Sequence, residues 1–264
     1  MLKQQWQLFL LAVGFFTRVP VPPHPNFKES DLNQAARYFP LVGLLVGLMA
    51  TLSWWLLSLG LPPALAILGS MATTILLTGA FHEDGLADSA DGLGGGLDRA
   101  RKLEIMQDSR LGSYGAIALV GILLAKFHAL SSLSAALLPF AWLCGHALSR
   151  LAAVLIMATS QYVRFQGKSK PLATQLTRLD LQVALATGLA CWLLFVVFLL
   201  LHHPLKGAVA FVLCTGLPVV TVWLLWRRTL LKQLQGYTGD TLGATQQLTE
   251  LAFYLGLIVW ERML

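Results

Sequence analysis

The sequence has few charged residues and few cysteines. Only 12% of its 264 residues are charged, whereas 56% are hydrophobic and the mean hydropathy is +0.67. Soluble domains carry about a quarter charged residues, so this composition excludes an ordinary soluble protein and indicates a polytopic membrane protein. The three cysteines, Cys144, Cys191 and Cys214, all lie in apolar runs, so no disulfide framework is expected.

The N-terminal region lacks the pattern of a cleavable signal peptide. Its apolar stretch from Trp6 to Phe16 runs into Arg18 and several prolines instead of a small-residue cleavage site. The stretch is about half as long as a bilayer crossing requires, which predicts a short interfacial or re-entrant helix. Because the chain also has no internal repeat and no low-complexity linker, we expect residues 1–264 to form a single membrane domain.

Long apolar runs predict an all-α integral membrane bundle with about six to seven transmembrane helices. The expected spans are residues 38–59, 64–80, 111–130, 138–158, 181–201, 208–226 and 248–260. If they alternate, residues 1–37, 81–110, 161–180 and 227–247 share one face, which then carries fifteen of the nineteen lysines and arginines, Arg164, Lys168 and Lys170 among them. The positive-inside rule places this face in the cytoplasm.

Acidic residues are concentrated in one stretch between two apolar runs. Residues 79–115 contain seven of the thirteen acidic residues, and Asp84, Asp88 and Asp91 stand at positions i, i+4 and i+7. On a helix all three would project from one face. Crowded carboxylates repel one another unless they are protonated, solvated or bound to a cation. Their spacing favours Mg²⁺, which takes one or two carboxylates and completes its shell with water and phosphate oxygens; a solvated acidic loop is the alternative.

Polar segments on the predicted cytoplasmic face offer the other groups of a phosphoryl-transfer site. Arg18 and Arg110 are suited to bind a phosphate group, and a carboxylate or His82 is suited to accept the proton of an attacking hydroxyl. Lys126 lies in an apolar run, where a charge is costly, so it serves either the site or a contact with the membrane surface. Asp108 and Ser109 also fit a cap of the following helix. The glycines at 92 and 94–96 favour a flexible turn over a nucleotide loop, because no Lys-Ser or Lys-Thr follows them.

Five motifs together resemble the cobalamin synthase family, the adenosylcobinamide-GDP ribazoletransferases of coenzyme B12 assembly. They lie at residues 15–22 (FFTRVPVP), 39–43 (FPLVG), 79–92 (GAFHEDGLADSADG), 103–115 (LEIMQDSRLGSYG) and 236–244 (GYTGDTLGA). The resemblance implies a Mg²⁺-dependent enzyme that joins adenosylcobinamide-GDP to α-ribazole, or to its 5′-phosphate, with release of GMP. It also implies a protein of the bacterial cytoplasmic membrane with its active site on the cytoplasmic side. The lipid bilayer and the two substrates are the expected partners, and no nucleic acid is expected. The resemblance is compatible with a homo-oligomer and with association with other cobamide-assembly enzymes.

The residues and the resemblance together assign three groups of site residues. The metal-binding group is Glu83, Asp84, Asp88 and Asp91. The catalytic group is His82, Asp84, Asp88, Asp91, Asp108 and Arg110. The substrate-binding group is Arg18, Ser109, Arg110, Lys126, Thr238 and Asp240.

Two other classes of membrane protein share part of the pattern. The run Asp88-Ser-Ala-Asp91-Gly92 matches the start of the CDP-alcohol phosphotransferase motif, but the downstream paired acids are missing at the required spacing. A secondary transporter would explain many spans and charges within them, yet no inverted repeat is visible and the acids lie outside the mid-membrane segments. Both remain alternatives at the level of sequence.

Overall fold

The computed structural model describes residues 2–25, 27–163, 176–202 and 204–263. In these ranges the chain is helical between short connections, and its only β-type pairing is an isolated bridge between Tyr162 and Tyr237. The all-α prediction is therefore confirmed. Arg164, Lys168 and Lys170 lie outside the described residues. The elements are α1 Leu2–Phe16, α2 Glu29–Ala35, η1 Ala36–Tyr38, α3 Phe39–Ser58, α4 Pro63–Thr78, α5 Phe81–Gly95, α6 Arg99–Ile105, α7 Ser113–Ser131, α8 Leu138–Thr159, α9 Arg178–His202, α10 Leu205–Leu234 and α11 Gly239–Glu261.

Five helical segments in the described ranges are long and apolar enough to cross a membrane. They are Ser30–Ser58, which contains α3, and the helices α7, α8, α9 and α10; the bent pair α4 and α5 makes a sixth if it counts as one span. With the bent pair counted, the total of six agrees with the lower end of the predicted range; without it, the described residues contain one span fewer than predicted. Helix α11 forms where the last span was expected, but it is not among these segments, and α1 is the short helix predicted at the N-terminus.

Prolines begin several of these helices, as their chemistry favours. Pro40, Pro63 and Pro139 lie in the first turn of α3, α4 and α8. The first backbone N–H groups of a helix have no intrahelical acceptor, so proline loses no hydrogen bond there, and its fixed φ suits the helix.

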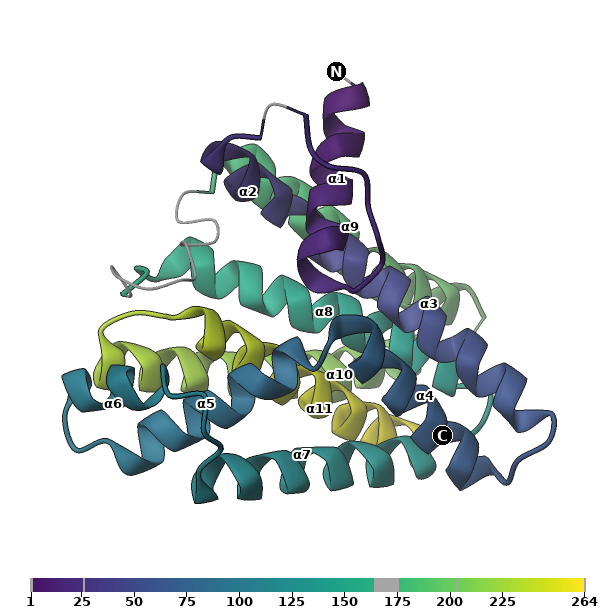
Figure 1. Ribbon diagram of the computed structural model, residues 1–264. Coiled ribbons are helices and arrows are strands. Elements are labelled where there is room, and N and C mark those ends of the chain that lie inside the picture. The colour runs from purple at the N-terminus through teal and green to yellow at the C-terminus, as the bar shows by residue number, and fades with distance from the viewer. Residues whose placement is uncertain (1, 26, 164–175, 203, 264) are drawn as a thin grey trace.

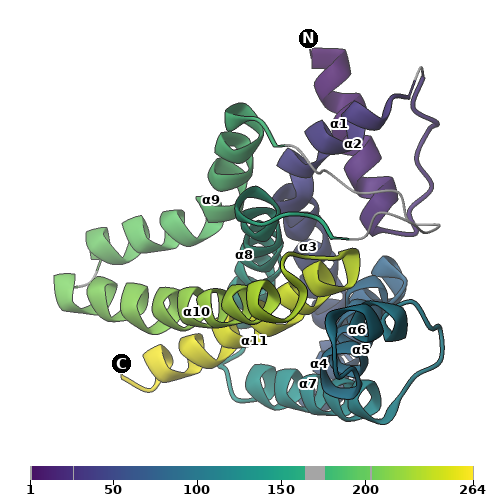
Figure 2. The ribbon, with the colours of Figure 1, turned by 90° about the vertical axis from the view of Figure 1, so that its left-hand side faces the viewer.

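The polar connections gather at one end of the bundle. In Figure 1, α6, the end of α8 and the connection from α10 to α11 lie at the left-hand end, whereas the α3–α4 turn and the C-terminus lie at the right-hand end. Figure 2 shows α3 and α8 near the centre, the α9–α10 hairpin on one side, and α4 to α7 on the other.

Helix α4 ends in a sharp bend that redirects the chain into α5. The two helices meet at 85° across Gly79 and Ala80, which both adopt left-handed backbone conformations with φ of 66° and 58°. Such a conformation is common for glycine and unusual for alanine. The predicted span 64–80 is thus a helix of 16 residues that leads into the bend, and not a complete crossing by itself. The bend aligns α5 with α7 and α11 (Figure 1).

Glycines allow α5 to approach its neighbours closely. A Cβ atom on Gly85 would lie 2.7 Å from the backbone oxygen of Asp240, and one on Gly243 would lie 3.1 Å from that of His82. A side chain at Gly92 would collide with Met106, and one at Gly94 with the Tyr114 ring. The prediction of a turn over this glycine run was wrong for its first part, because Gly92, Gly94 and Gly95 belong to α5. They serve as contact points and not as a flexible connection.

Candidate active site

Helix α5 carries the predicted acidic face. Asp84, Asp88 and Asp91 all lie within Phe81–Gly95, so the helical spacing inferred from the sequence is confirmed. Along this face Asp84 is exposed, Asp88 is half-buried and Asp91 is buried. A helix rises about 1.5 Å per residue, which separates the first and last of these acids by about 10 Å along the axis. The face therefore begins in an open environment and ends inside the protein.

Asp91 stabilises the start of α7. Its Oδ2 accepts a hydrogen bond from the Gly112 N–H and its Oδ1 accepts one from the Gly115 N–H, both at 2.8 Å. The first N–H groups of a helix need external acceptors, and a carboxylate also interacts favourably with the helix dipole. The sequence had offered Asp108 and Ser109 as this cap; that alternative was wrong, because the cap comes from α5.

Asp108 and Arg110 form an exposed pair in the connection between α6 and α7. Arg110 Nη2 lies 2.6 Å from Asp108 Oδ2, and Arg110 Nε donates to both carboxylate oxygens. The hydrogen bonds from Arg110 lower the pKa of Asp108 to about 2, and the same contact raises the pKa of Arg110. Ser109, between them, is exposed. The bond from Gly112 to Asp91 places this connection beside the buried end of the acidic face.

Arg18, Thr238 and Asp240 lie beside the other end of the face. The Arg18 backbone N–H donates to the Leu77 carbonyl at 2.8 Å, and its guanidinium lies over Gly79, immediately before α5. Asp240 lies in the first turn of α11, against Gly85. Thr238 is fully buried as the N-cap of α11 and accepts from the Thr241 N–H at 3.3 Å. The structure therefore brings Arg18 and Asp240 to the acids and gives Thr238 a capping role.

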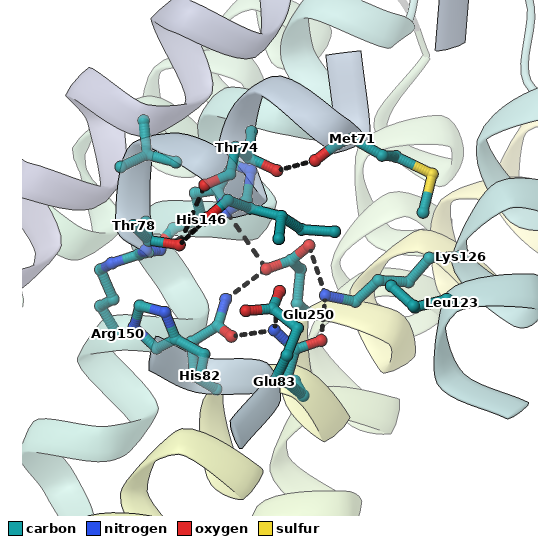
Figure 3. A pocket seen from close by; sticks show the side chains of 14 residues that line it. Met71, Thr74, Thr78, His82, Glu83, Leu123, Lys126, His146, Arg150 and Glu250 are labelled. Atoms are coloured by element: carbon teal, nitrogen blue, oxygen red, sulfur yellow. Dashed lines mark hydrogen bonds and ion pairs between the residues drawn. The ribbon is translucent and has the colours of Figure 1, made fainter. Parts of the chain in front are cut away.

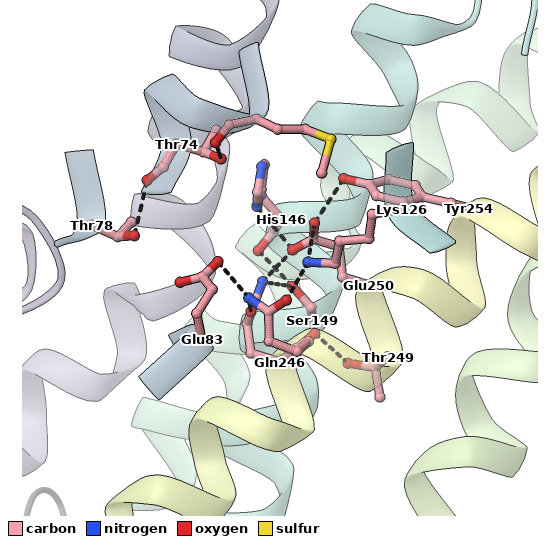
Figure 4. A network of polar contacts seen from close by, with 12 residues as sticks. Thr74, Thr78, Glu83, Lys126, His146, Ser149, Gln246, Thr249, Glu250 and Tyr254 are labelled. Atoms are coloured by element: carbon pink, nitrogen blue, oxygen red, sulfur yellow. Dashed lines mark hydrogen bonds and ion pairs between the residues drawn. The ribbon is translucent and has the colours of Figure 1, made fainter. Parts of the chain in front are cut away.

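A buried polar network centred on Glu250 joins α5, α7, α8 and α11 (Figure 4). Glu250 Oε1 lies 2.8 Å from Lys126 Nζ and accepts from the Tyr254 hydroxyl at 3.1 Å. Its Oε2 lies 3.1 Å from His146 Nδ1 and accepts from the Gln246 amide. Glu250 is only 3% exposed, so these partners replace the water that the carboxylate loses on burial.

Gln247 connects this network to α5. Its Nε2 donates to Glu83 Oε1 and to Gln246 Oε1, both at 2.9 Å, while its own Oε1 accepts from Lys126 Nζ at 2.6 Å. Glu83 therefore points into the protein, although the neighbouring Asp84 is exposed. Lys126 is held by two side chains of α11, and the substrate-binding role that we expected for it stays a prediction.

A small polar cavity lies beside the network (Figure 3). Its volume is about 20 Å³, room for about one water molecule. It is lined by His82 and Glu83 from α5 and by Arg150 from α8, among others. Each of these three has a buried atom that lacks a hydrogen-bond partner among the described residues: His82 Nε2, Glu83 Oε2 and Arg150 Nε. Buried polar atoms are rarely left unpaired, so this cavity and its surroundings are suited to bind a polar group of a ligand.

Four residues of this network are not among the site residues predicted from the sequence: Gln246, Gln247, Glu250 and Tyr254. A signal was present, because the run Thr245-Gln-Gln-Leu-Thr-Glu250 interrupts the last apolar helix. Polar and charged side chains are costly in such a helix and usually have a partner or a function. The partners lie on other helices, and their proximity is a property of the fold.

The residues around α5 are compatible with a Mg²⁺ ion shared with a substrate. In the part of the chain that the structure describes, no three His, Cys, Asp or Glu side chains group closely enough to hold a metal. Asp84 and Asp88, one helical turn apart on the open part of the face, fit an ion that takes one or two carboxylates and fills its shell with water and phosphate. Glu83 accepts a hydrogen bond from Gln247, and Asp91 accepts two from backbone N–H groups at the start of α7. The metal assignment of all four acids stays a prediction.

The fold and the site define an integral membrane protein of helices with an acidic face that has arginines at both ends. Residues 8–258 match the family described as Cobalamin-5-phosphate synthase, and the chain belongs to this family. The resemblance seen in the sequence motifs is thereby confirmed, and the two alternative classes lose their support.

Curated relatives match the chain over nearly its whole length. A protein of Shewanella piezotolerans (strain WP3 / JCM 13877) is 47% identical over 97% of this chain and 96% of its own, and one of Ralstonia pickettii (strain 12J) is 44% identical over 98% of each. A protein of Shewanella frigidimarina (strain NCIMB 400) is 46% identical over 97% of this chain and 95% of its own. All three are named adenosylcobinamide-GDP ribazoletransferase. The chain matches no solved structure.

Proposed function

We propose that the protein is a transferase that joins adenosylcobinamide-GDP to α-ribazole or α-ribazole 5′-phosphate and releases GMP. A ribose hydroxyl of the acceptor attacks the phosphorus of the cobinamide phosphate. The new P–O bond forms as the bond to the GMP phosphate breaks, GMP leaves with the bonding electron pair, and the hydroxyl proton passes to a base. The products are adenosylcobalamin, or its 5′-phosphate, and GMP.

The observation that carries this proposal is the family match over residues 8–258, which includes the acidic helix and both flanking arginines. An alcohol that attacks a diphosphate needs charge neutralisation on the phosphates, an anchor for them, and an acceptor for the proton. Asp84 and Asp88 on the open face, Arg18 and Arg110 at its two ends, and His82 on the same helix supply residue types suited to these tasks.

We propose that the enzyme requires Mg²⁺ and that Asp84 and Asp88 are its principal ligands. When bound, the ion would neutralise charge on the diphosphate and on the departing phosphate of GMP. The residues of the chain do the rest. Arg110 has its side chain 88% exposed, so it can exchange Asp108 for a phosphate oxygen. Arg18, also exposed, offers a second guanidinium beside the start of α5.

His82 is our candidate for the proton acceptor. Its ring stacks on Phe16 with ring centroids 5.5 Å apart, which holds the imidazole in one plane. Its Nε2 has no partner among the described residues, so a hydroxyl of a bound acceptor can donate to it. If only one of Asp84 and Asp88 binds the ion, the other is the alternative, since a carboxylate that is not coordinated can take the same proton.

We place the protein in the bacterial cytoplasmic membrane with the acidic face toward the cytoplasm. The clustering of α6 and the α10–α11 connection at one end of the bundle supports this orientation (Figure 1), together with the bias of lysine and arginine toward the same segments. The two substrates and the bilayer are its proposed partners; self-association and contacts with other cobamide-assembly enzymes stay expectations from the family resemblance.

The test is GMP release by the purified protein in lipid vesicles. Adenosylcobinamide-GDP and α-ribazole are supplied with Mg²⁺ or with excess EDTA, and GMP is quantified by chromatography. The proposal predicts GMP only when both substrates and Mg²⁺ are present. GMP release that ignores α-ribazole would indicate hydrolysis instead, and release in EDTA would remove the metal requirement.

A further inference from the structure

An aromatic pocket adjoins the polar cavity and shares His82, Arg150 and Gln246 with it. Its other walls are four phenylalanines, Phe15 and Phe16 of α1, Phe39 of α3 and Phe81 of α5, with Gly239 and Gly243 of α11 at another edge. The cavity has a volume of about 50 Å³. Four helices and the α1 segment before Arg18 thus enclose one apolar space with few polar groups, which is the usual composition of a site for a small organic molecule.

The aromatic rings of this pocket form both edge-to-face and stacked pairs. The centroids of Phe16 and Phe39 lie 4.4 Å apart at 87°, and those of Phe15 and Phe81 lie 5.2 Å apart at 84°. Phe16 and His82 are stacked, with only 10° between their planes. Such walls present both ring faces and ring edges, and a flat aromatic ligand can pack against either.

Two buried polar atoms of the pocket lack a hydrogen-bond partner among the described residues. Arg150 is 2% exposed and His82 is 4% exposed, and Arg150 Nε and His82 Nε2 form no hydrogen bond with any described residue. Arg150 Nη1 does donate to the His146 carbonyl at 3.1 Å, so the guanidinium is held in place while its Nε–H stays available. Figure 3 shows Arg150 and His82 next to each other. An unpaired buried donor is costly, so a ligand that supplies an acceptor here would bind favourably.

We propose that this pocket binds the aromatic base of the acceptor nucleoside, a flat nitrogen heterocycle whose ring nitrogen accepts a hydrogen bond from Arg150 Nε. The inference rests on the proposed function and adds the position of one substrate. A cavity of about 50 Å³ is smaller than a two-ring base. Entry therefore requires Phe81, a residue that is 40% exposed, to rotate away from Phe15 and Phe16.

The position of the pocket also orients the rest of the acceptor. Gly239 and Gly243, at one edge, belong to the start of α11, which packs through Asp240 against Gly85 of α5. A base held between the phenylalanines would direct its ribose toward this edge. Gly243 also lies against the backbone oxygen of His82, so the hydroxyl of the ribose lies on the side of the pocket that His82 lines.

Gly239 lines the pocket, and a larger side chain can be placed there without disturbing the fold. A Cβ atom at Gly239 meets nothing within 4 Å, its φ is not positive, and leucine is a better helix former than glycine. Gly121, on the exposed surface of α7, has the same properties and lies outside the pocket. We therefore compare Gly239→Leu with Gly121→Leu, and measure binding of radiolabelled α-ribazole to the protein in detergent as well as GMP release.

Gly239→Leu is expected to weaken α-ribazole binding and raise its KM by at least about tenfold, with little change in the KM for adenosylcobinamide-GDP. Gly121→Leu is expected to behave as the unmodified protein. If the unmodified protein releases GMP and the two variants have the same KM for α-ribazole, the pocket is not the base site and the proposed function still stands. Absence of GMP release would instead contradict the proposed function, while the binding measurement still decides about the pocket.

A competition experiment on the unmodified protein tests the hydrogen bond directly. Benzimidazole and indole have nearly the same shape, but only benzimidazole has a ring nitrogen that can accept from Arg150 Nε–H. We expect benzimidazole to displace labelled α-ribazole at a concentration at least about tenfold lower than indole, because a site built around a hydrogen bond discriminates against a ligand that cannot make it. Equal displacement by both compounds would overturn the role of Arg150, and displacement by neither would overturn the pocket itself.

Discussion

The acidic face of α5 and the network around Glu250 contain the same kinds of side chain in opposite environments. Asp84 is exposed and Arg110 forms a pair at the surface, whereas Glu250 has four side-chain partners and almost no contact with solvent. Water stabilises the charges of Asp84 and Arg110, so these two side chains can exchange partners during a reaction. In the network around Glu250 only other protein groups stabilise the charges, so each buried charge depends on its partners.

This contrast separates an effect on activity from an effect on stability. Breaking a buried ion pair by removing one partner costs roughly 3–5 kcal/mol, whereas an exposed pair contributes roughly 0–1 kcal/mol. Substitutions in the network should therefore lower the free energy of unfolding more than substitutions of exposed pairs. Substitutions on the open part of α5 should leave stability unchanged and remove turnover.

The largest effect is expected for Glu250→Ala. It leaves Lys126 and His146 buried without their shared carboxylate, and the free energy of unfolding should fall by roughly 3–5 kcal/mol. The measurement is thermal or denaturant unfolding in detergent. Glu104→Ala, which breaks an exposed pair with Arg101, is the matched control and should have little effect. Equal stability of the two variants would show that the network does not support the fold.

Asp84→Asn and Asp88→Asn should show the opposite behaviour. We expect each to lower GMP release by at least about a hundredfold, because the amide is a weaker ligand than the carboxylate and lacks its charge. Their unfolding midpoints should match that of the unmodified protein. Normal turnover in both would exclude these two acids from a metal site.

Asp91→Asn tests whether the third acid belongs to the site or to the fold. Asp91 accepts hydrogen bonds from two N–H groups with its two oxygens, whereas asparagine has only one carbonyl oxygen. We therefore expect a loss of roughly 0.5–2 kcal/mol in the free energy of unfolding. The Mg²⁺ concentration for half-maximal activity should not change. An unchanged stability with a raised Mg²⁺ requirement would identify Asp91 as a metal ligand instead.

Arg110→Lys is expected to have a moderate effect on activity. Lysine cannot reproduce a two-point contact with a phosphate, so the KM for adenosylcobinamide-GDP should rise by about tenfold. Arg101→Lys, on the exposed surface of the nearby α6, is the control and should be neutral. An effect of the same size in both variants would indicate a general loss of positive field and not a specific contact.

The smallest effect is expected in the pH dependence of the Asp108–Arg110 pair. The pKa of Asp108 is lowered from 3.8 to about 2, so the stabilisation from this pair is fully present above the ordinary value and is lost only as the pH falls through about 2. Asp108 therefore should not titrate between about pH 5 and 9. The acidic limb of the pH–rate profile of Asp108→Asn should coincide with that of the unmodified protein, at whatever activity remains; a shifted limb would contradict the assignment.

Local sequence patterns predicted the parts of the site that lie on one segment. The i, i+4, i+7 spacing of Asp84, Asp88 and Asp91 placed them on one helical face, and α5 confirms it. Local patterns failed for the glycines after Asp91, because the residues that contact them, Met106 and Tyr114, lie outside α5. They also missed the bend at Gly79 and Ala80, since nothing in an apolar run predicts a left-handed alanine.

The sequence by itself determined that this is a helical membrane protein of the cobalamin synthase type with an acidic helix. Hydropathy, helical spacing and linear motifs are all properties of neighbouring residues. Only the tertiary structure decided that Asp91 caps α7, that Glu83 faces inward while Asp84 faces outward, and that Glu250 collects partners from α7, α8 and α11. The physical reason is that a buried polar group is stabilised by the partner that packing places beside it. Lys126 and Glu250 are such partners, and more than a hundred residues separate them along the chain.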